Sequence, residues 1–213
     1  MPVHLVLASG SPSRRQLLHR AGIDASVVVS DVDEEAAVES ARVGGDDPSP
    51  GDIALVLARA KAESVASSLR AHANHLVLGC DSVLELDGRA YGKPGTAELA
   101  TERWRGMRGR SGVLHTGHWL VDDRAAGSHG VVGATASTTV HFADLTDEEI
   151  AAYVATGEPL AVAGAFTLEG RGAPYIDAVE GDPSNVIGLS LPLLRHLLAQ
   201  VGLRFDQLTE ELS

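Results

Sequence analysis

Residues 3–22 read as a strand, a short turn and a helix, and this unit constrains the fold more than any other stretch. Apolar residues over 3–8 predict a buried strand. Ser11 suits the N-cap of the helix, Pro12 its first position and Gly22 the residue just past its end. The turn S-G-S-P-S-R-R places two arginines on the first helical turn, where the helix dipole disfavours cations. An anion bound there would remove the conflict, so the unit predicts an anion site at a strand-to-helix junction.

The rest of the chain mixes strands and helices without strict alternation. Alternating and apolar stretches predict strands over 25–29, 76–86, 113–121, 131–142, 165–168 and 175–179. Helical spacing and end signals predict helices over 53–69, 96–107, 146–155 and 191–201. The predicted fold class is α/β, with a mixed twisted sheet, flanking helices and two lobes around a central cleft. No stretch has the composition of a linker, so we expect one domain over residues 1–213.

Composition and charge exclude several classes of protein. With 213 residues, 44% of them hydrophobic, the chain can form an ordinary globular core. The net charge of −12 opposes binding to nucleic-acid backbones or anionic membranes, so we expect neither partner. No apolar run approaches the roughly 20 residues that span a bilayer, and no signal peptide is recognisable. The single cysteine, Cys80, excludes an intrachain disulfide and favours a cytoplasmic location.

Polar and basic side chains gather at the first strand-to-helix junction. They are Ser9, Ser11, Arg14 and Arg15. Backbone N–H groups at a helix N-terminus suit phosphate oxygens, and arginine adds a bidentate fork that also matches phosphate. The alternative is that Ser11 is only a helix cap and that both arginines are solvated.

Two groups of carboxylates are candidates for metal binding or proton transfer. The first follows the second expected strand and contains Asp31, Asp33, Glu34 and Glu35. Such a run is usually a solvated loop, but beside a phosphate site one or two of its members can hold Mg²⁺. The second is Asp81, which interrupts an apolar strand. A carboxylate there is costly unless it is paired or bound to a metal, so Asp81 is the strongest single candidate.

Only two of the 17 basic residues are lysines. Lys61 lies in the middle of an expected helix, in A-R-A-K-A, and Lys93 lies on a tight turn, in G-K-P. Composition alone leaves open whether they are functional or ordinary surface lysines.

The histidines of residues 113–121 do not form an expected metal site. His115 and His118 are three positions apart on one strand, so their side chains face opposite sides of it. We expect both to be strand-surface histidines, and Cys80 to be a small buried residue.

Taken together, the motifs along the chain resemble those of the Maf family of nucleoside-triphosphate pyrophosphatases. They are L-A-S-G-S-P-S-R-R-Q-L-L at 7–18, D-E at 33–34, A-x-x-K-A around Lys61, D-S-V at 81–83, G-K-P at 92–94, S-G-x-x-H at 111–115, A-G-A-F at 163–166 and G-D-P-S-N-V-I-G-L-S-L at 181–191. Each motif is weak alone, but their order and spacing cover nearly the whole chain.

The resemblance implies an activity and a set of site residues. Maf proteins have an α/β fold with a cleft between two lobes, similar to that of the inosine-triphosphate pyrophosphatases. They hydrolyse a nucleoside triphosphate to the monophosphate and pyrophosphate with a divalent cation, Mg²⁺ or Mn²⁺. The proton acceptor of the family falls on Asp81, and its phosphate- and metal-handling residues fall on Ser9, Arg14, Glu34, Lys61 and Lys93. Glu34 and Asp81 are the implied metal ligands, and both lysines fall on functional positions.

The resemblance also implies a cellular setting. The family is linked to arrest of septum formation, and many of its members form homodimers. We therefore expect a homodimer that binds a nucleoside triphosphate.

This chain departs from the family pattern in two places. S-P-S-R stands where S-P-R-R is usual, so Ser13 replaces an arginine, and one phosphate or base contact is missing unless Arg15 replaces it. Members that prefer dTTP and UTP resemble I-Q-G where this chain has L-E-G at 168–170. A carboxylate only accepts hydrogen bonds, which suits the two adjacent donors of guanine or 7-methylguanine. The family's 7-methyl-GTP branch resembles this pattern; the alternative is that Glu169 is a surface residue.

Two other functions stay open from the sequence. The chain can be a non-catalytic nucleotide-binding regulator of septum formation, although the intact Asp81 and both lysines argue against lost activity. It can also be a hydrolase of different regiochemistry that releases orthophosphate.

Overall fold

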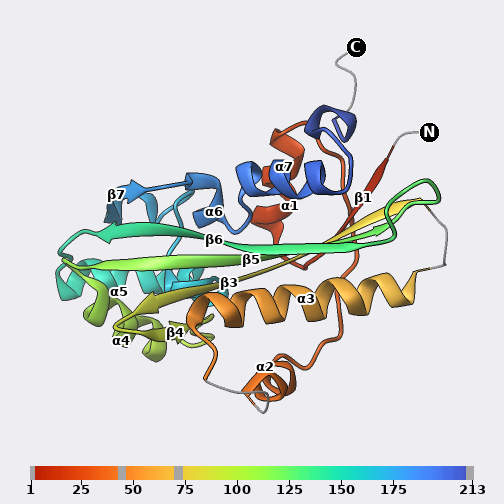
Figure 1. Ribbon diagram of the computed structural model, residues 1–213. Coiled ribbons are helices and arrows are strands. Elements are labelled where there is room, and N and C mark those ends of the chain that lie inside the picture. The colour runs from red at the N-terminus through yellow and green to blue at the C-terminus, as the bar shows by residue number, and fades with distance from the viewer. Residues whose placement is uncertain (1–2, 43–46, 70–73, 210–213) are drawn as a thin grey trace.

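A mixed β-sheet forms the centre of the computed structural model, which describes residues 3–42, 47–69 and 74–209 (Figure 1). Its strands are β1 (His4–Ala8), β2 (Ser26–Val27), β3 (His75–Leu86), β4 (Arg89–Tyr91), β5 (Ser111–Asp123), β6 (Val131–Phe142) and β7 (Ile176–Glu180). The α-helices are α1 (Pro12–Arg20), α2 (Glu34–Arg42), α3 (Pro50–Ser68), α4 (Ala97–Met107), α5 (Asp147–Ala155), α6 (Pro183–Ile187) and α7 (Leu191–Gln200). Short 3₁₀ helices are η1 (Glu158–Ala161), η2 (Ala163–Ala165), η3 (Ala173–Tyr175) and η4 (Phe205–Gln207). Among these described helices, none is long and apolar enough to cross a membrane.

The sheet has seven strands in the order β2-β1-β3-β5-β6-β7, and β4 pairs with the far end of β3. β1 pairs in parallel with both β2 and β3. The pairings of β3 with β4 and β5, of β5 with β6 and of β6 with β7 are antiparallel. This arrangement confirms the predicted α/β fold class with a mixed sheet and flanking helices.

One predicted strand was wrong. Residues 165–168 form no strand, because Gly164 and Ala165 have φ angles of 72° and 63° and turn the backbone at η2. The apolar composition of A-G-A-F reflects burial rather than extension, since Ala165 and Phe166 are buried.

The acidic run after β2 is also not a plain loop. Asp33 accepts a hydrogen bond from the backbone N–H of Ala36 at 3.0 Å, and α2 starts at Glu34. Glu34 and Glu35 occupy its first turn, where the helix dipole favours carboxylates. The sequence did not reveal α2, because acidic residues are common both in solvated loops and at helix starts.

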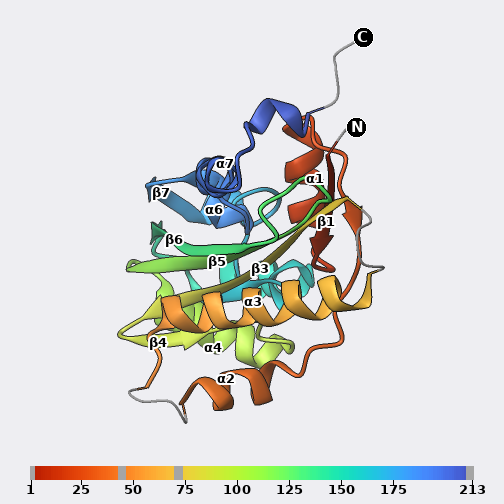
Figure 2. The same ribbon diagram turned by 45° about the vertical axis from the view of Figure 1, so that its right-hand side comes forward.

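Helix α3 covers one face of the sheet, while α1, α6 and α7 lie on the other (Figure 2). α3 approaches the sheet closely because glycines face it. A β-carbon added at Gly79 would lie 2.1 Å from the carbonyl oxygen of Ala58, and one at Gly117 would lie 2.2 Å from that of Ala54. The two glycines therefore fix how close α3 comes to β3 and β5.

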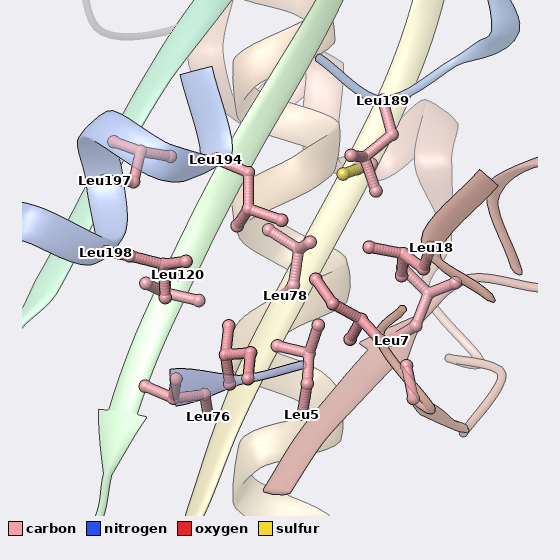
Figure 3. Packing of buried hydrophobic residues seen from close by; sticks show 14 of the residues in the cluster. Leu5, Leu7, Leu18, Leu76, Leu78, Leu120, Leu189, Leu194, Leu197 and Leu198 are labelled. Atoms are coloured by element: carbon pink, nitrogen blue, oxygen red, sulfur yellow. The ribbon is translucent and has the colours of Figure 1, made fainter. Parts of the chain in front are cut away.

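On the opposite face, the core divides into two hydrophobic clusters. The first joins β1, β3, β5, α1 and α7, and Figure 3 shows its leucines interlocking between the strands and α7. The second joins the other ends of β3, β5 and β6 to α4, α5 and Phe166. Along β3, Leu78 belongs to the first cluster and Leu84 to the second, with Ser82 between them. The clusters correspond to the two lobes expected from the sequence.

A band of hydrogen-bonded polar side chains separates the two clusters. Ser82 and Thr116 share a hydrogen bond of 2.9 Å, and Thr116 donates to the Asn185 carbonyl at 3.2 Å. Asn185 Nδ2 donates to Thr138 Oγ1 at 3.0 Å and to Leu114 O at 3.1 Å. Because the three hydroxyls and the Asn185 Nδ2 group are paired, these polar residues are tolerated in the middle of the core, although the buried Asn185 Oδ1 has no partner among the described residues.

His118 contradicts the expectation of a surface histidine. It is fully buried, with Nδ1 donating to Thr116 O at 3.0 Å and Nε2 accepting from the Ser190 N–H at 2.8 Å. Burial lowers the pKa of His118 to about 4, although the hydrogen bond to Thr116 opposes the shift. His115 lies on the other face, as expected, and bonds to Glu85 and Ser137.

Candidate active site

A gap in the edge of the sheet creates the candidate active site. β1 pairs with β3 only as far as Gly79, and β4 begins to pair at Leu84. Over residues 80–83, β3 has β5 on one side and, within the described chain, no strand on the other. A cleft of about 680 Å³ opens at this edge, a size that suits a nucleotide. Side chains from both faces of the strand, Asp81 and Ser82, reach it.

Eight of the candidate residues named from the sequence line this cleft, whereas Asp31, Asp33 and Glu35 of the acidic run do not. The eight are Ser9, Ser11, Arg14, Glu34, Lys61, Asp81, Lys93 and Glu169. They come from α1 and the turn before it, α2, α3, β3, the turn after β4 and the loop after η2. Arg15 is exposed and does not line the cleft, whereas Ser13 does.

Lys61 joins the two carboxylates that were expected to bind metal. Its Nζ forms an ion pair with Asp81 and a second one, at 2.7 Å, with Glu34. The side chains of Lys61 and Asp81 are only 13% and 14% exposed, so water screens their charges poorly. The pair explains how a carboxylate is tolerated within an apolar strand.

Arg14 is buried, and the protein itself uses most of its donors. Nε donates to Gly188 O at 2.6 Å, and Nη1 donates to Ser9 Oγ at 2.9 Å and Cys80 O at 2.8 Å. Nη2 donates to Ser82 Oγ at 2.9 Å. Four of the five N–H donors of the guanidinium are therefore engaged within the protein. Arg14 offers the cleft its charge but not a free bidentate fork. It ties α1 to the open edge of β3 and to the turn before α7.

The two serines shape the turn in front of α1. Ser11 Oγ accepts from the backbone N–H of Arg14 at 3.4 Å, and Pro12 is the first helical residue, which confirms the predicted helix start. Ser9 Oγ accepts from Ser11 N at 3.3 Å as well as from Arg14. Each hydroxyl thus acts as an acceptor within the protein and keeps its own O–H to donate to an oxygen in the cleft.

Lys93 is the more available of the two cleft lysines. It is exposed on the turn after β4, and no ion pair among the described residues involves it. Lys61 is occupied by two carboxylates, so Lys93 is better placed to meet an anionic ligand first.

Glu158 holds the loop that forms the opposite wall of the cleft. It accepts hydrogen bonds from Tyr153 Oη at 3.2 Å, Thr167 Oγ1 at 2.5 Å, Arg171 N at 3.1 Å and Gly172 N at 3.0 Å. Burial opposes its ionisation, but these hydrogen bonds outweigh burial and lower the pKa of Glu158. Its partners flank residues 168–170 on both sides, so one carboxylate fixes both ends of that segment.

Glu169 lies at the tip of this loop and is not an isolated surface residue. Its carboxylate forms an ion pair with Arg20, the last residue of α1. The Glu169 side chain is 32% exposed and lines the cleft. It therefore faces the space that a ligand would fill, with one oxygen already engaged.

Sequence reasoning missed two residues of the site. Ser82 stands beside Asp81 in the motif D-S-V. Because neighbouring residues of a strand face opposite sides of the sheet, the sequence places Ser82 on the face opposite to Asp81, and there it accepts a hydrogen bond from Arg14. Glu158 precedes Pro159 in an unremarkable stretch, and its role depends on a loop that returns to it nine or more residues later. No local pattern could have identified it.

Comparison with known proteins identifies the family. The sequence profile described as Maf-like protein matches residues 4–201. The chain belongs to the Maf family. A nucleoside triphosphate pyrophosphatase of Streptomyces coelicolor is 58% identical over 204 residues, which span 96% of this chain and 93% of that protein. One of Salinispora tropica is 54% identical over 205 residues, spanning 95% and 86%.

A solved structure shows a weaker likeness. A nucleoside-triphosphatase / dITP/XTP pyrophosphatase from Mycobacterium abscessus matches with a TM-score of 0.37 and 15% identity, over 67% of this chain and 76% of that one. The much closer sequence relatives confirm the family resemblance of the motifs.

The cleft of this Maf protein offers a divalent cation two carboxylates that lie close together. Glu34 and Asp81 reach the same ammonium group, so their carboxylates converge on one point of the cleft. Mg²⁺ is commonly held by one or two carboxylates together with waters and substrate phosphates. Within the described residues, no group of three or more metal-binding side chains occurs. The cleft therefore suits a cation that substrate helps to bind rather than a closed protein cage.

Proposed function

We propose that this Maf protein hydrolyses a nucleoside triphosphate to the monophosphate and pyrophosphate. The observation that carries the proposal is the meeting of Asp81, Lys61 and Glu34 at an open sheet edge, beside a helix N-terminus suited to phosphate. The two relatives compared above are named nucleoside triphosphate pyrophosphatases, which supports the same activity here.

The proposed reaction is an in-line attack of water on the α-phosphorus. Asp81 orients the water and accepts its proton while the oxygen bonds to phosphorus. The bond from the α-phosphorus to the bridging oxygen breaks, and its electron pair leaves with pyrophosphate. Lys61 and Lys93 offset the negative charge that grows on the leaving group, and the Arg14 charge adds to theirs.

A divalent cation, Mg²⁺ or Mn²⁺, belongs to the same proposal, with Glu34 and Asp81 as its protein ligands. When bound, it supplies positive charge against the triphosphate and acts as a Lewis acid. Binding would require Lys61 to release at least one of these carboxylates and to turn towards phosphate oxygens. Chelation by EDTA should therefore stop turnover, and added Mg²⁺ or Mn²⁺ should restore it.

We propose that Glu169 recognises the base of the nucleotide through hydrogen bonds. Its carboxylate accepts but does not donate, so it matches the adjacent N1–H and amino donors of guanine or 7-methylguanine. A uracil or thymine edge needs one donor and one acceptor from the protein, which a carboxylate cannot supply. We therefore propose a guanine-type base in preference to thymine or uracil.

One experiment tests the activity and the base together. Purified protein with Mg²⁺ is given dTTP, UTP, CTP, GTP and 7-methyl-GTP in turn, and both pyrophosphate and orthophosphate are measured. Pyrophosphate released fastest from GTP or 7-methyl-GTP is the expected result. Orthophosphate as the only product would contradict the regiochemistry, binding without turnover would favour the regulator, and a clear dTTP preference would contradict the role of Glu169. The expected homodimer and the link to septum formation stay predictions from the family resemblance, and the cytoplasmic location stays a prediction from the single cysteine.

A further inference from the structure

The ion pair between Arg20 and Glu169 joins the two walls of the cleft. Arg20 ends α1, whose Leu17 and Leu18 belong to the first hydrophobic cluster. Glu169 follows Phe166, which belongs to the second cluster. The partners are 149 positions apart in the sequence. Among the described residues, no other hydrogen bond or ion pair links α1 to the segment 156–172.

This ion pair contributes little to the stability of the fold. The two side chains are 56% and 32% exposed, so water and salt screen the attraction. Exposed pairs of this kind contribute little to the free energy of unfolding. An interaction this weak can yield to a ligand, and it biases the orientation of the Glu169 side chain when the cleft is empty.

The pair leaves part of the Glu169 carboxylate available. Arg20 Nη1 donates to Oε2, and no hydrogen bond among the described residues involves Oε1. Two carboxylate oxygens have about four lone-pair sites, so Glu169 can accept from Arg20 and from a base at the same time. Arg20 thus restricts the carboxylate without consuming it.

We propose that Arg20 is a positioning residue that sets base preference by orienting Glu169, an inference that rests on the proposed function. Arg20 lies outside the cleft lining and acts only through Glu169. Without Arg20 the Glu169 side chain is free to change rotamer, and the match to two adjacent donors of a guanine base is lost for part of the time. The chemistry at Asp81 does not depend on this pair.

The test compares wild-type protein with Arg20→Ala and Arg20→Lys, using GTP and dTTP with pyrophosphate release as the readout. For Arg20→Ala we expect the ratio of kcat/KM for GTP to that for dTTP to fall by up to about fivefold, because an exposed ion pair biases a side-chain orientation by no more than about this factor. The loss should be in KM for GTP, with kcat and the melting temperature unchanged. Arg20→Lys keeps the charge but not the guanidinium fork, so it should recover part of the ratio.

Arg204→Ala is the matched control, because Arg204 also forms an exposed ion pair, with Asp206, and does not line the cleft. It should leave the ratio unchanged. If the wild-type protein is active and Arg20→Ala does not alter its base ratio, the inference is overturned. A parallel fall in kcat for both nucleotides with a lower melting temperature would also overturn it, since that is a structural role. A wild-type protein that releases no pyrophosphate from any nucleotide refutes the proposed function itself.

Discussion

Gly79 of β3 lies so close to Ala58 of α3 that a β-carbon on the glycine would come within 2.1 Å of the alanine carbonyl oxygen. No side chain other than hydrogen fits between the strand and the helix at this point. The contact lies two residues before Asp81 on the strand and three residues before Lys61 on the helix. The spacing between backbone atoms here therefore sets the distance between the two charged groups of the site.

Gly79→Ala should destabilise the protein and reduce its turnover. The added methyl group must push α3 away from β3, which moves Lys61 relative to Asp81. Overpacking of this kind costs about 1–3 kcal/mol, and a clash with backbone places this variant at the upper end. The check is a chemical denaturation curve together with the rate of pyrophosphate release. Gly106→Ala on α4 is the control, because a β-carbon there meets nothing within 4 Å and should leave both measurements intact or raise stability slightly.

Asp81→Asn should leave the fold intact and remove most turnover. The amide keeps the shape of the side chain but cannot accept the proton of the attacking water, and general-base catalysis typically contributes about 10²–10⁴-fold. We expect a rate loss in that range with a circular dichroism spectrum like that of the wild type. Glu63→Gln removes an exposed carboxylate from α3 and should not change the rate. Near-normal turnover of a folded Asp81→Asn protein would show that another group accepts the proton.

Glu158→Gln should raise KM more than it lowers kcat. The amide keeps one acceptor oxygen for Thr167 and Gly172 but places an NH₂ group where the Arg171 N–H donates, so the loop that carries Glu169 loses part of its anchor. Lost hydrogen bonds to a charged group cost about 1–3 kcal/mol of stability. Steady-state kinetics with GTP and a thermal melt check both effects.

The control for this loop variant is Glu149→Gln, which alters a carboxylate of similar capping chemistry on α5, away from the cleft. It should lower the melting temperature slightly and leave KM unchanged. Equal KM values for wild-type and Glu158→Gln protein would mean that the loop holds its shape without the anchor.

His118 should make the protein less stable in mild acid. The native state keeps this histidine neutral down to a pKa of about 4, whereas the unfolded chain takes up the proton near the ordinary value of 6.5. The free energy of unfolding should therefore fall as the pH drops from about 6.5 to 4, by about 3 kcal/mol in total, and should not change further from this cause at lower pH. Arg14 and Asp182 act on the same ring with opposite signs, and burial remains the largest cause.

Urea denaturation of wild-type and His118→Gln protein at several pH values between 4 and 7 checks this prediction. The glutamine oxygen can still accept from the Ser190 N–H but does not titrate, so the slope of stability against pH should become flatter by up to one proton. His19→Gln, at an exposed position on α1, should keep the wild-type slope. An unchanged slope in His118→Gln would place the acid sensitivity elsewhere.

Sequence reasoning predicted the elements of this fold where the signals are local. Ser11, Pro12 and Gly22 delimited α1, and the Thr146 capping box marked the start of α5. It failed where a local pattern has two solutions. Acidic residues suit a loop and a helix N-terminus equally, and A-G-A-F has strand-like residues although the positive φ of Ala165 bends it into a turn.

For the site, the sequence predicted which residues would gather but not how they are used. Asp81 was expected to be paired or bound to a metal because an unpaired charge in an apolar strand is costly, and it does pair with Lys61. The burial of Arg14 was not expected, because its acceptors at Cys80 and Gly188 are backbone carbonyls that no residue pattern reveals. His118 was misplaced for the same reason, since only the tertiary fold brings Ser190 onto the ring.

The two hydrophobic clusters share their strands. β3, β5 and β6 each send side chains into both clusters, so the two walls of the cleft rest on one continuous ladder of backbone hydrogen bonds. A rigid-body rotation of one wall against the other would break backbone hydrogen bonds between these strands. The relative position of the two walls is therefore set during folding, and the release of a carboxylate by Lys61 proposed above is a movement of side chains only. The affinity for a nucleotide therefore depends on the contacts that it makes in the cleft, and binding does not have to bring the two walls together.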